Sequence, residues 1–89
     1  MSLGQVSYSV SEITQHIKSE IESDPVLQDL WIEGELSNWK RSAAGHCYFT
    51  LKDAEAAING VMWRTTAGRL SFLPQDGLSV LAHGRVSVY

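Results

Sequence analysis

The stretch GHCYFTLKD, residues 45–53, decides the fold because apolar and polar side chains alternate along it. Residues two apart in a β-strand point to the same face of the sheet. One predicted face is apolar: Cys47, Phe49 and Leu51. The opposite face offers rings, a hydroxyl group and a cation: His46, Tyr48, Thr50 and Lys52. The stretch is therefore predicted to be a strand that has one face in a core and the other in solvent.

The same period of two recurs on both sides of this strand. Further strands are predicted at LWIEGELSNW (30–39), AINGVMW (57–63) and LSVLAHGRVSVY (78–89). The inward side of 57–63 stays open, because both of its sides carry apolar residues. Gly34, in the middle of the first strand, favours a bend or bulge there. Between the first two strands we predict a loop that carries Trp39, Lys40 and Arg41 and turns at 42–45.

One helix is predicted before the strands, over residues 10–24. Ser9 and Glu12 have capping-box spacing, and the residue before Pro25 is pushed out of the helical region, which ends the helix. The apolar residues of the helix recur at helical spacing: Val10, Ile13, Ile17 and Ile21. Such a stripe needs a partner, and we expect the strands to cover it. A short helical turn is predicted at 65–72, before Pro74.

This order of elements predicts a mainly β domain with an N-terminal α-helix, of the OB-fold class. An OB-fold is a five-stranded Greek-key barrel that binds oligonucleotides on strands two and three and the adjoining loops. Four strands are visible, so the fifth is expected beyond Tyr89. The predicted organisation is a tail (1–9), the helix (10–24) and the barrel domain (25–89). An SH3-like barrel fits the strand count but leaves no natural place for the insert at 65–72.

Composition and charge narrow the function classes. The 89 residues suffice for one small domain, and 44% hydrophobic with 19% charged residues excludes a disordered chain. A single cysteine excludes an internal disulfide, and neither a membrane-length apolar run nor a secretion signal is present, so a cytoplasmic location without membrane contact is expected. Residues 1–39 hold one cation and seven carboxylates, whereas 40–89 hold six cations and three carboxylates. A locally basic surface suits a polyanion, although so few charges could also be distributed by chance.

Three pieces of the sequence carry a family resemblance: EGELSNW (33–39), GHCYFTLKD (45–53) and VMWR (61–64). In this order and spacing, the chain over roughly residues 10–89 resembles the N-terminal domain of the exodeoxyribonuclease VII large subunit. The resemblance implies an OB-fold that holds single-stranded DNA for degradation to oligonucleotides by a catalytic domain outside this chain. It also implies the small subunit and further large-subunit domains as partners. A weaker similarity to the anticodon-binding barrels of aspartyl- and lysyl-tRNA synthetases keeps tRNA binding open.

Residue chemistry points to one candidate surface. Single strands are bound by cations along their phosphates and by flat rings on which bases stack. The candidate nucleic-acid-binding residues are Trp39, Lys40, Arg41, His46, Tyr48, Lys52, Trp63 and Arg64. The rings also have structural interpretations: Trp39 closes the end of the barrel, Trp63 belongs to the core, and His46 and Tyr48 are ordinary strand residues.

No catalytic residue is predicted. Cys47 lies on the apolar face, where a thiol is inert, and the three histidines have no metal-ligand spacing. The glycines lie singly, so a phosphate-cradling loop is absent from the sequence. We therefore expect neither a metal nor a cofactor in this domain. Besides nucleic-acid binding, a protein-assembly module stays open, including a dimer formed through a strand edge that lacks its fifth-strand neighbour.

Overall fold

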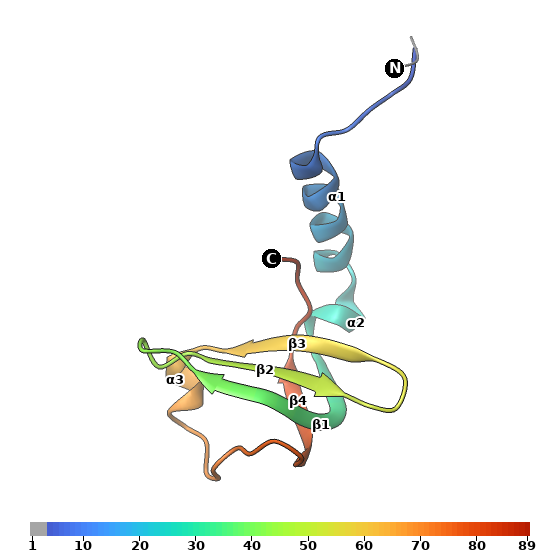
Figure 1. The fold of residues 1–89 in the computed structure, drawn as a ribbon. Coiled ribbons are helices and arrows are strands. Elements are labelled where there is room, and N and C mark those ends of the chain that lie inside the picture. The colour runs from blue at the N-terminus through green and yellow to red at the C-terminus, as the bar shows by residue number, and fades with distance from the viewer. Residues whose placement is uncertain (1–3) are drawn as a thin grey trace. The chain divides into compact units, whose positions relative to one another are not determined.

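The computed structural model describes residues 4–89, so the first three residues of the predicted tail lie outside the described part of the chain. Its elements are α1 (Val10–Glu22), α2 (Pro25–Gln28), β1 (Leu30–Arg41), β2 (Cys47–Lys52), β3 (Ala57–Met62), α3 (Arg64–Ala67) and β4 (Ser79–Gly84). The four strands form one sheet in the order β3-β2-β1-β4 (Figure 1). The chain divides into two compact units. One unit is Ile32–Ala82, and the other combines the residues before Ile32 with His83–Tyr89.

The core of the unit Ile32–Ala82 lies on the predicted apolar face of β2. Cys47 and Leu51 are 2% and 4% exposed, and Leu36 on β1 is 4% exposed. β2 pairs antiparallel with β3 without a break, so that Leu51 lies opposite Ile58 and Cys47 opposite Met62. Directly opposite residues share a face of the sheet. The inward side of β3, which the sequence leaves open, is therefore the side of Ile58, Gly60 and Met62.

A β-bulge bends β1 near its C-terminal end. Ser37 lies opposite Thr50, and Lys40 lies opposite Tyr48, so two residues of β1 face one residue of β2. The first of the two, Asn38, has a φ of 53°, a left-handed conformation that asparagine tolerates better than most residues. The sequence predicts a bend or bulge at Gly34, and of these two the bulge lies further along the strand, between Ser37 and Lys40. Gly34 instead allows a close approach, because a Cβ atom there would lie 3.3 Å from the Lys52 carbonyl oxygen.

Beyond this bulge, β1 continues through Lys40 and Arg41, which are predicted from the sequence to lie in a loop. That prediction is wrong because the bulge restores pairing with β2. The turn after the strand is tight, as expected from 42–45: the Gly45 N–H donates to the Ser42 carbonyl oxygen at 2.9 Å, and Gly45 has a φ of 89°.

The segment after β3 returns to β1 beside the bulge. It begins with α3, a single turn that is shorter than the predicted one. The Trp39 N–H donates to Oδ1 of Asp76 at 2.9 Å, which gives the bulged backbone an acceptor. Two further hydrogen bonds of 2.8 Å join Leu36 to the residues just before β4. The Gly77 N–H donates to the Leu36 carbonyl oxygen, and the Leu36 N–H donates to the Leu78 carbonyl oxygen. This segment thus stabilises the bend of β1.

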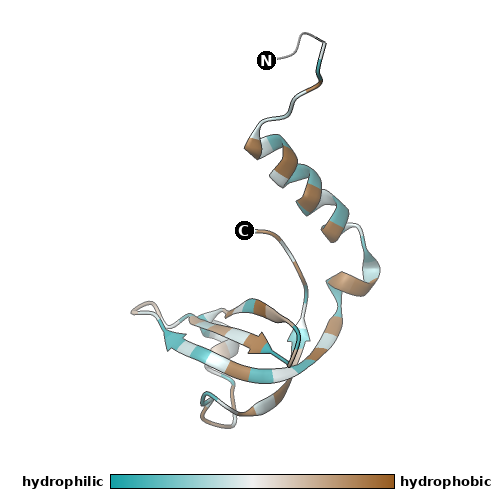
Figure 2. Ribbon diagram, turned by 45° about the vertical axis from the view of Figure 1, so that its right-hand side comes forward, coloured by the Kyte–Doolittle hydropathy of each residue, from teal (hydrophilic) through white to brown (hydrophobic). Residues whose placement is uncertain are grey.

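In the other unit, α1 begins as predicted. The Ser9 side chain accepts from the Glu12 N–H at 3.0 Å, and the Glu12 carboxylate accepts from the Ser9 N–H at 3.2 Å. Apolar positions recur along the helix (Figure 2), and the first three of them are exposed. Val10 is 85% exposed, and Ile13 and Ile17 are 42% and 45% exposed. Ile21, the last apolar residue of the stripe, is half-buried within this unit, and burial of the stripe against the strands stays a prediction. A short second helix, α2, follows, in which Asp24 caps the Val26 N–H at 2.9 Å.

The last residues of this unit leave the sheet. β4 ends at Gly84, whereas the predicted strand continued to residue 89. The Val86 N–H donates to the Leu27 carbonyl oxygen at 2.7 Å, and Nε2 of Gln28 donates to the Val86 carbonyl oxygen at 3.1 Å. These bonds explain the difference, because they join residue 86 to α2 and not to a neighbouring strand.

Candidate nucleic-acid interface

The solvent side of β1, β2 and β3, called the outer face below, is built from three cross-strand rows. Tyr48 lies opposite Lys40 on one side and Val61 on the other. Thr50 lies between Ser37 and Asn59, and its Oγ1 donates to Oδ1 of Asn59 at 3.1 Å. In the third row, Lys52 lies between Glu35 and Ala57. Strand alternation placed Tyr48 and Lys52 here in advance. Ser37, Asn59 and Val61 were not identified from the sequence, because finding them requires the pairing register.

The bulge decides which cations reach the outer face. Lys40 lies opposite Tyr48, which is 47% exposed, and so it shares the outer face with Tyr48. Arg41 lies opposite the buried Cys47, and so it belongs to the inner side of the sheet, at an exposed strand end. Two cations that are adjacent in sequence are thus placed on opposite faces. Lys52, on the same side as Tyr48, is four residues along β2, or about 13 Å at the usual rise of a strand.

At the turn end of the outer face, three predicted site residues come together. The His46 ring meets the Trp63 ring edge to face, with centroids 5.2 Å apart and planes at 87°. Nδ1 of His46 accepts from the Arg64 N–H at 3.0 Å. Trp63 is 48% exposed, so the interpretation of Trp63 as a core residue is not supported.

Trp39 is turned away from this face. Its ring stacks on Phe49, with centroids 5.4 Å apart and planes at 23°. Phe49 in turn lies over Gly60, where an added Cβ atom would be 2.5 Å from the Phe49 ring. Trp39 therefore closes one end of the apolar core, in agreement with its structural interpretation. A contact of Trp39 or Arg41 with nucleic acid stays a prediction.

The end of the outer face remote from the turn is acidic. Glu35 lies opposite Lys52, and a shallow hollow at this end is lined by Glu33, Glu35, Lys52 and Asp53 with three small residues. Asp53 accepts from the N–H groups of Glu55 at 2.8 Å and Ala56 at 2.9 Å. These two bonds, the one from Glu55 first, lower the pKa of the Asp53 carboxyl, so it stays charged. Lys40, Arg64 and the rings thus gather toward the turn, whereas Lys52 lies among the carboxylates at the opposite end.

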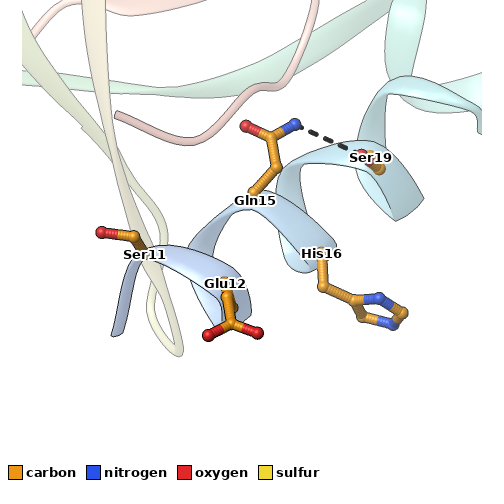
Figure 3. Close-up of a pocket in the computed structure, with 5 residues that line it drawn as sticks. All are labelled: Ser11, Glu12, Gln15, His16 and Ser19. Carbon is orange, nitrogen blue, oxygen red and sulfur yellow. Dashed lines mark hydrogen bonds between the residues drawn. The ribbon is translucent and has the colours of Figure 1, made fainter. Parts of the chain in front are cut away.

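A second hollow lies on the polar face of α1, lined by Ser11, Glu12, Gln15, His16 and Ser19 (Figure 3). Gln15 donates to Ser19 at 3.4 Å across it. One helix supplies every wall, so the hollow encloses nothing. Among residues 4–89, no three His, Cys, Asp or Glu side chains gather as a metal site would require. In the same residues, no helix has the length and apolar character needed to cross a bilayer.

Comparison with known proteins agrees with this architecture. Residues 8–89 match a family model described as an OB-fold nucleic acid binding domain. The exodeoxyribonuclease 7 large subunit of Halalkalibacterium halodurans is 48% identical over 91% of this chain and 18% of its own length. Those of Halothermothrix orenii and Bacillus subtilis are 50% and 46% identical over 92% and 98% of this chain, each over 20% of its own length.

The chain thus spans about a fifth of the length of the curated relatives it matches. The resemblance carried by the motifs at 33–39, 45–53 and 61–64 is confirmed by these relatives, and the predicted fold class is confirmed by the family match. With its four-stranded sheet and its family match over nearly all residues, the chain belongs to the OB-fold nucleic acid binding domains.

Proposed function

We propose that this domain binds single-stranded DNA on the outer face and holds it for a nuclease domain elsewhere in an exodeoxyribonuclease VII large subunit. In this proposal the catalytic residues lie outside the chain, and the domain itself needs no cofactor. The small subunit and the other large-subunit domains are its partners in the cytoplasm. The names of the relatives support the parent enzyme, and the chemistry of the outer face supports the ligand.

One observation carries the proposal: the register brings Lys40, Tyr48 and Lys52 to one exposed face, which Trp63 and Arg64 extend. Each base stacked on a ring contributes about 1–3 kcal/mol, so Tyr48 and Trp63 could hold two bases. Each neutralised phosphate of a single strand changes the slope of log K against log salt concentration by about 0.7. With three cations the expected slope is therefore about −2.

The bulge provides a matched pair of variants for the test. Oligothymidylate is titrated into the 89-residue chain at several salt concentrations, and tryptophan fluorescence is followed. Lys40→Ala should weaken binding and flatten the slope by about 0.7. Arg41→Ala removes the same charge from the neighbouring residue but from the other side of the sheet, and it should do much less. Equal losses in the two variants would show that net charge, and not the outer face, governs binding.

The choice of nucleic acid is tested in the same assay. A structured RNA hairpin whose loop matches an anticodon is titrated alongside oligothymidylate. Single-strand binding by stacking predicts that oligothymidylate binds at least as tightly as the hairpin. A clear preference for the hairpin would contradict the proposal and favour tRNA recognition, in which base edges are read in addition to stacking.

A second candidate function, protein assembly, is favoured by two observations. β4 has one neighbour in the described sheet, which leaves its other edge unpaired, and the stripe on α1 is exposed. Unpaired edges tend to accept a strand from another chain. Sedimentation across a range of concentrations should then show a dimer that oligothymidylate does not disturb. A monomer at all concentrations would remove dimerisation from the account.

A further inference from the structure

His46 is held on two sides, which limits what its ring can do. Its N–H donates to Oγ of Ser42 at 3.1 Å, and its carbonyl oxygen accepts from the Ser42 N–H at 2.8 Å. Its Nδ1 accepts from the Arg64 N–H, and its ring meets Trp63 edge to face. The residue therefore ties the turn after β1 to the junction between β3 and α3.

The hydrogen bond from the Arg64 N–H to His46 gives an acceptor to an N–H group that has none within its own helix. Arg64 is the first residue of α3, and the first N–H groups of a helix have no partner within it. Trp63, which precedes it, makes no capping bond through its side chain. Nδ1 of His46 thus supplies from another segment the acceptor that a capping residue would supply.

The turn also brings the backbone close to the arginine. Gly45 has a φ of 89°, and a Cβ atom there would lie 3.4 Å from Cβ of Arg64. The Gly45 backbone lies close to Cβ of Arg64, and the His46 ring accepts a hydrogen bond from the Arg64 N–H. These two contacts hold the backbone and Cβ of Arg64, from which its side chain extends. The Trp63 ring packs edge to face against the same imidazole.

We propose that His46 is a positioning residue: it orients the Trp63 ring and the Arg64 side chain on the outer face and does not itself hold the nucleic acid. This inference rests on the proposed function. It reassigns His46 from the predicted contact residues to a supporting role. A neutral imidazole that accepts at Nδ1 carries its proton on Nε2, and the acceptor at Nδ1 is the property that the role requires.

Three substitutions separate positioning from contact. His46→Asn keeps an acceptor oxygen at about the distance of Nδ1 from the backbone. His46→Gln moves the acceptor one bond further out, to about the place of Nε2, and His46→Ala removes it. Oligothymidylate affinity should fall about tenfold in the Ala and Gln variants, as expected when one base stack is lost, and by less than about threefold in the Asn variant.

Coupling gives a second readout. If His46 acts through Trp63, then Trp63→Ala should cost far less affinity in the His46→Ala background than in the unsubstituted chain. Additive losses would show that the two residues contact the nucleic acid independently, and the inference would be overturned. An Asn variant as weak as the Ala variant would also overturn it, because the ring itself would then be required.

A third readout does not depend on nucleic acid. Hydrogen exchange of the Arg64 amide should be slow in the unsubstituted chain and in His46→Asn, and fast in His46→Ala. If this pattern holds while oligothymidylate does not bind at all, the structural basis of the inference stands and the proposed function fails. If the amide exchanges equally fast in all three proteins, the bond from Arg64 to His46 is absent and the inference fails. Urea unfolding of each variant checks that the fold persists.

Discussion

Gly60 offers a sharp test of how the core end of the sheet is built. A Cβ atom at this position would lie 2.5 Å from both Cε2 and Cζ of Phe49. Favourable contacts between carbon atoms are about 3.5–4.0 Å long, so in Gly60→Ala the Phe49 ring must move by about 1 Å. That ring also stacks on Trp39 with centroids 5.4 Å apart, so one added methyl group disturbs both aromatic residues.

The cost of Gly60→Ala follows from these two effects. Overpacking a core by one methyl group costs about 1–3 kcal/mol. Weakening an aromatic pair costs up to about 0.5–1.5 kcal/mol more. The free energy of unfolding should therefore fall by about 2–4 kcal/mol, with a changed near-ultraviolet circular dichroism signal from Trp39.

Urea unfolding measures this change, and Gly84 provides the control. A Cβ atom at Gly84 meets no atom within 4 Å, so Gly84→Ala should change the free energy of unfolding by less than about 0.5 kcal/mol. If Gly60→Ala is as stable as Gly84→Ala and keeps the native dichroism signal, then Phe49 does not lie over Gly60. The described closure of the core end would then be wrong.

Three further predictions concern the two faces of β2, the neighbouring Glu35 on β1, and the turn after β2. Leu51→Ala should lower the free energy of unfolding by about 2–5 kcal/mol, whereas Lys52→Ala on the outer face should change it by less than about 0.5 kcal/mol. Similar changes for the two variants in urea unfolding would contradict the placement of Leu51 in the core and Lys52 on the outer face. Glu35→Gln should raise oligothymidylate affinity about twofold by removing a carboxylate opposite Lys52, and a loss of affinity would refute the acidic boundary of the outer face. Because the pKa of Asp53 is lowered in the folded chain, the charged carboxylate stabilises the fold at pH values above the ordinary aspartate pKa of about 3.9. The difference in unfolding free energy between Asp53→Asn and the unsubstituted chain should therefore shrink as the pH falls below about 3.9. A difference that does not depend on pH would contradict the role of the charge.

The sequence was most informative where a short local pattern decides the structure. Alternation alone placed Cys47 and Leu51 in the core and Tyr48 and Lys52 on the opposite face. Ser9 and Glu12 fixed the start of α1, because the capping box needs both side chains at this spacing.

The features that were predicted wrongly depend on contacts between distant segments. The bulge lies at Asn38 and not at Gly34, because the left-handed residue there is followed by a bond from the Trp39 N–H to Asp76, which is 37 residues away. That bulge, in turn, separates Lys40 from Arg41. A pattern of period two cannot show a shift in register, so the membership of the outer face could be predicted only for β2.

The end of β4 has a similar cause. Its sequence alternates through residue 89, but the Val86 N–H bonds to Leu27. The exposed stripe on α1 shows a different limit of sequence patterns. Helical spacing predicts that the helix has an apolar face, but it does not identify what covers that face.

The proposed function requires that single-stranded DNA binds the outer face of β1, β2 and β3. Its most direct test is NMR mapping of chemical shifts in the 89-residue chain during titration with oligothymidylate. Binding at this face should give the largest shifts at Lys40, Tyr48, Lys52 and Trp63, with little change at Cys47 and Leu51, which lie between them in sequence. Shifts that are absent, or that concentrate on α1 while the outer face stays unchanged, would contradict it.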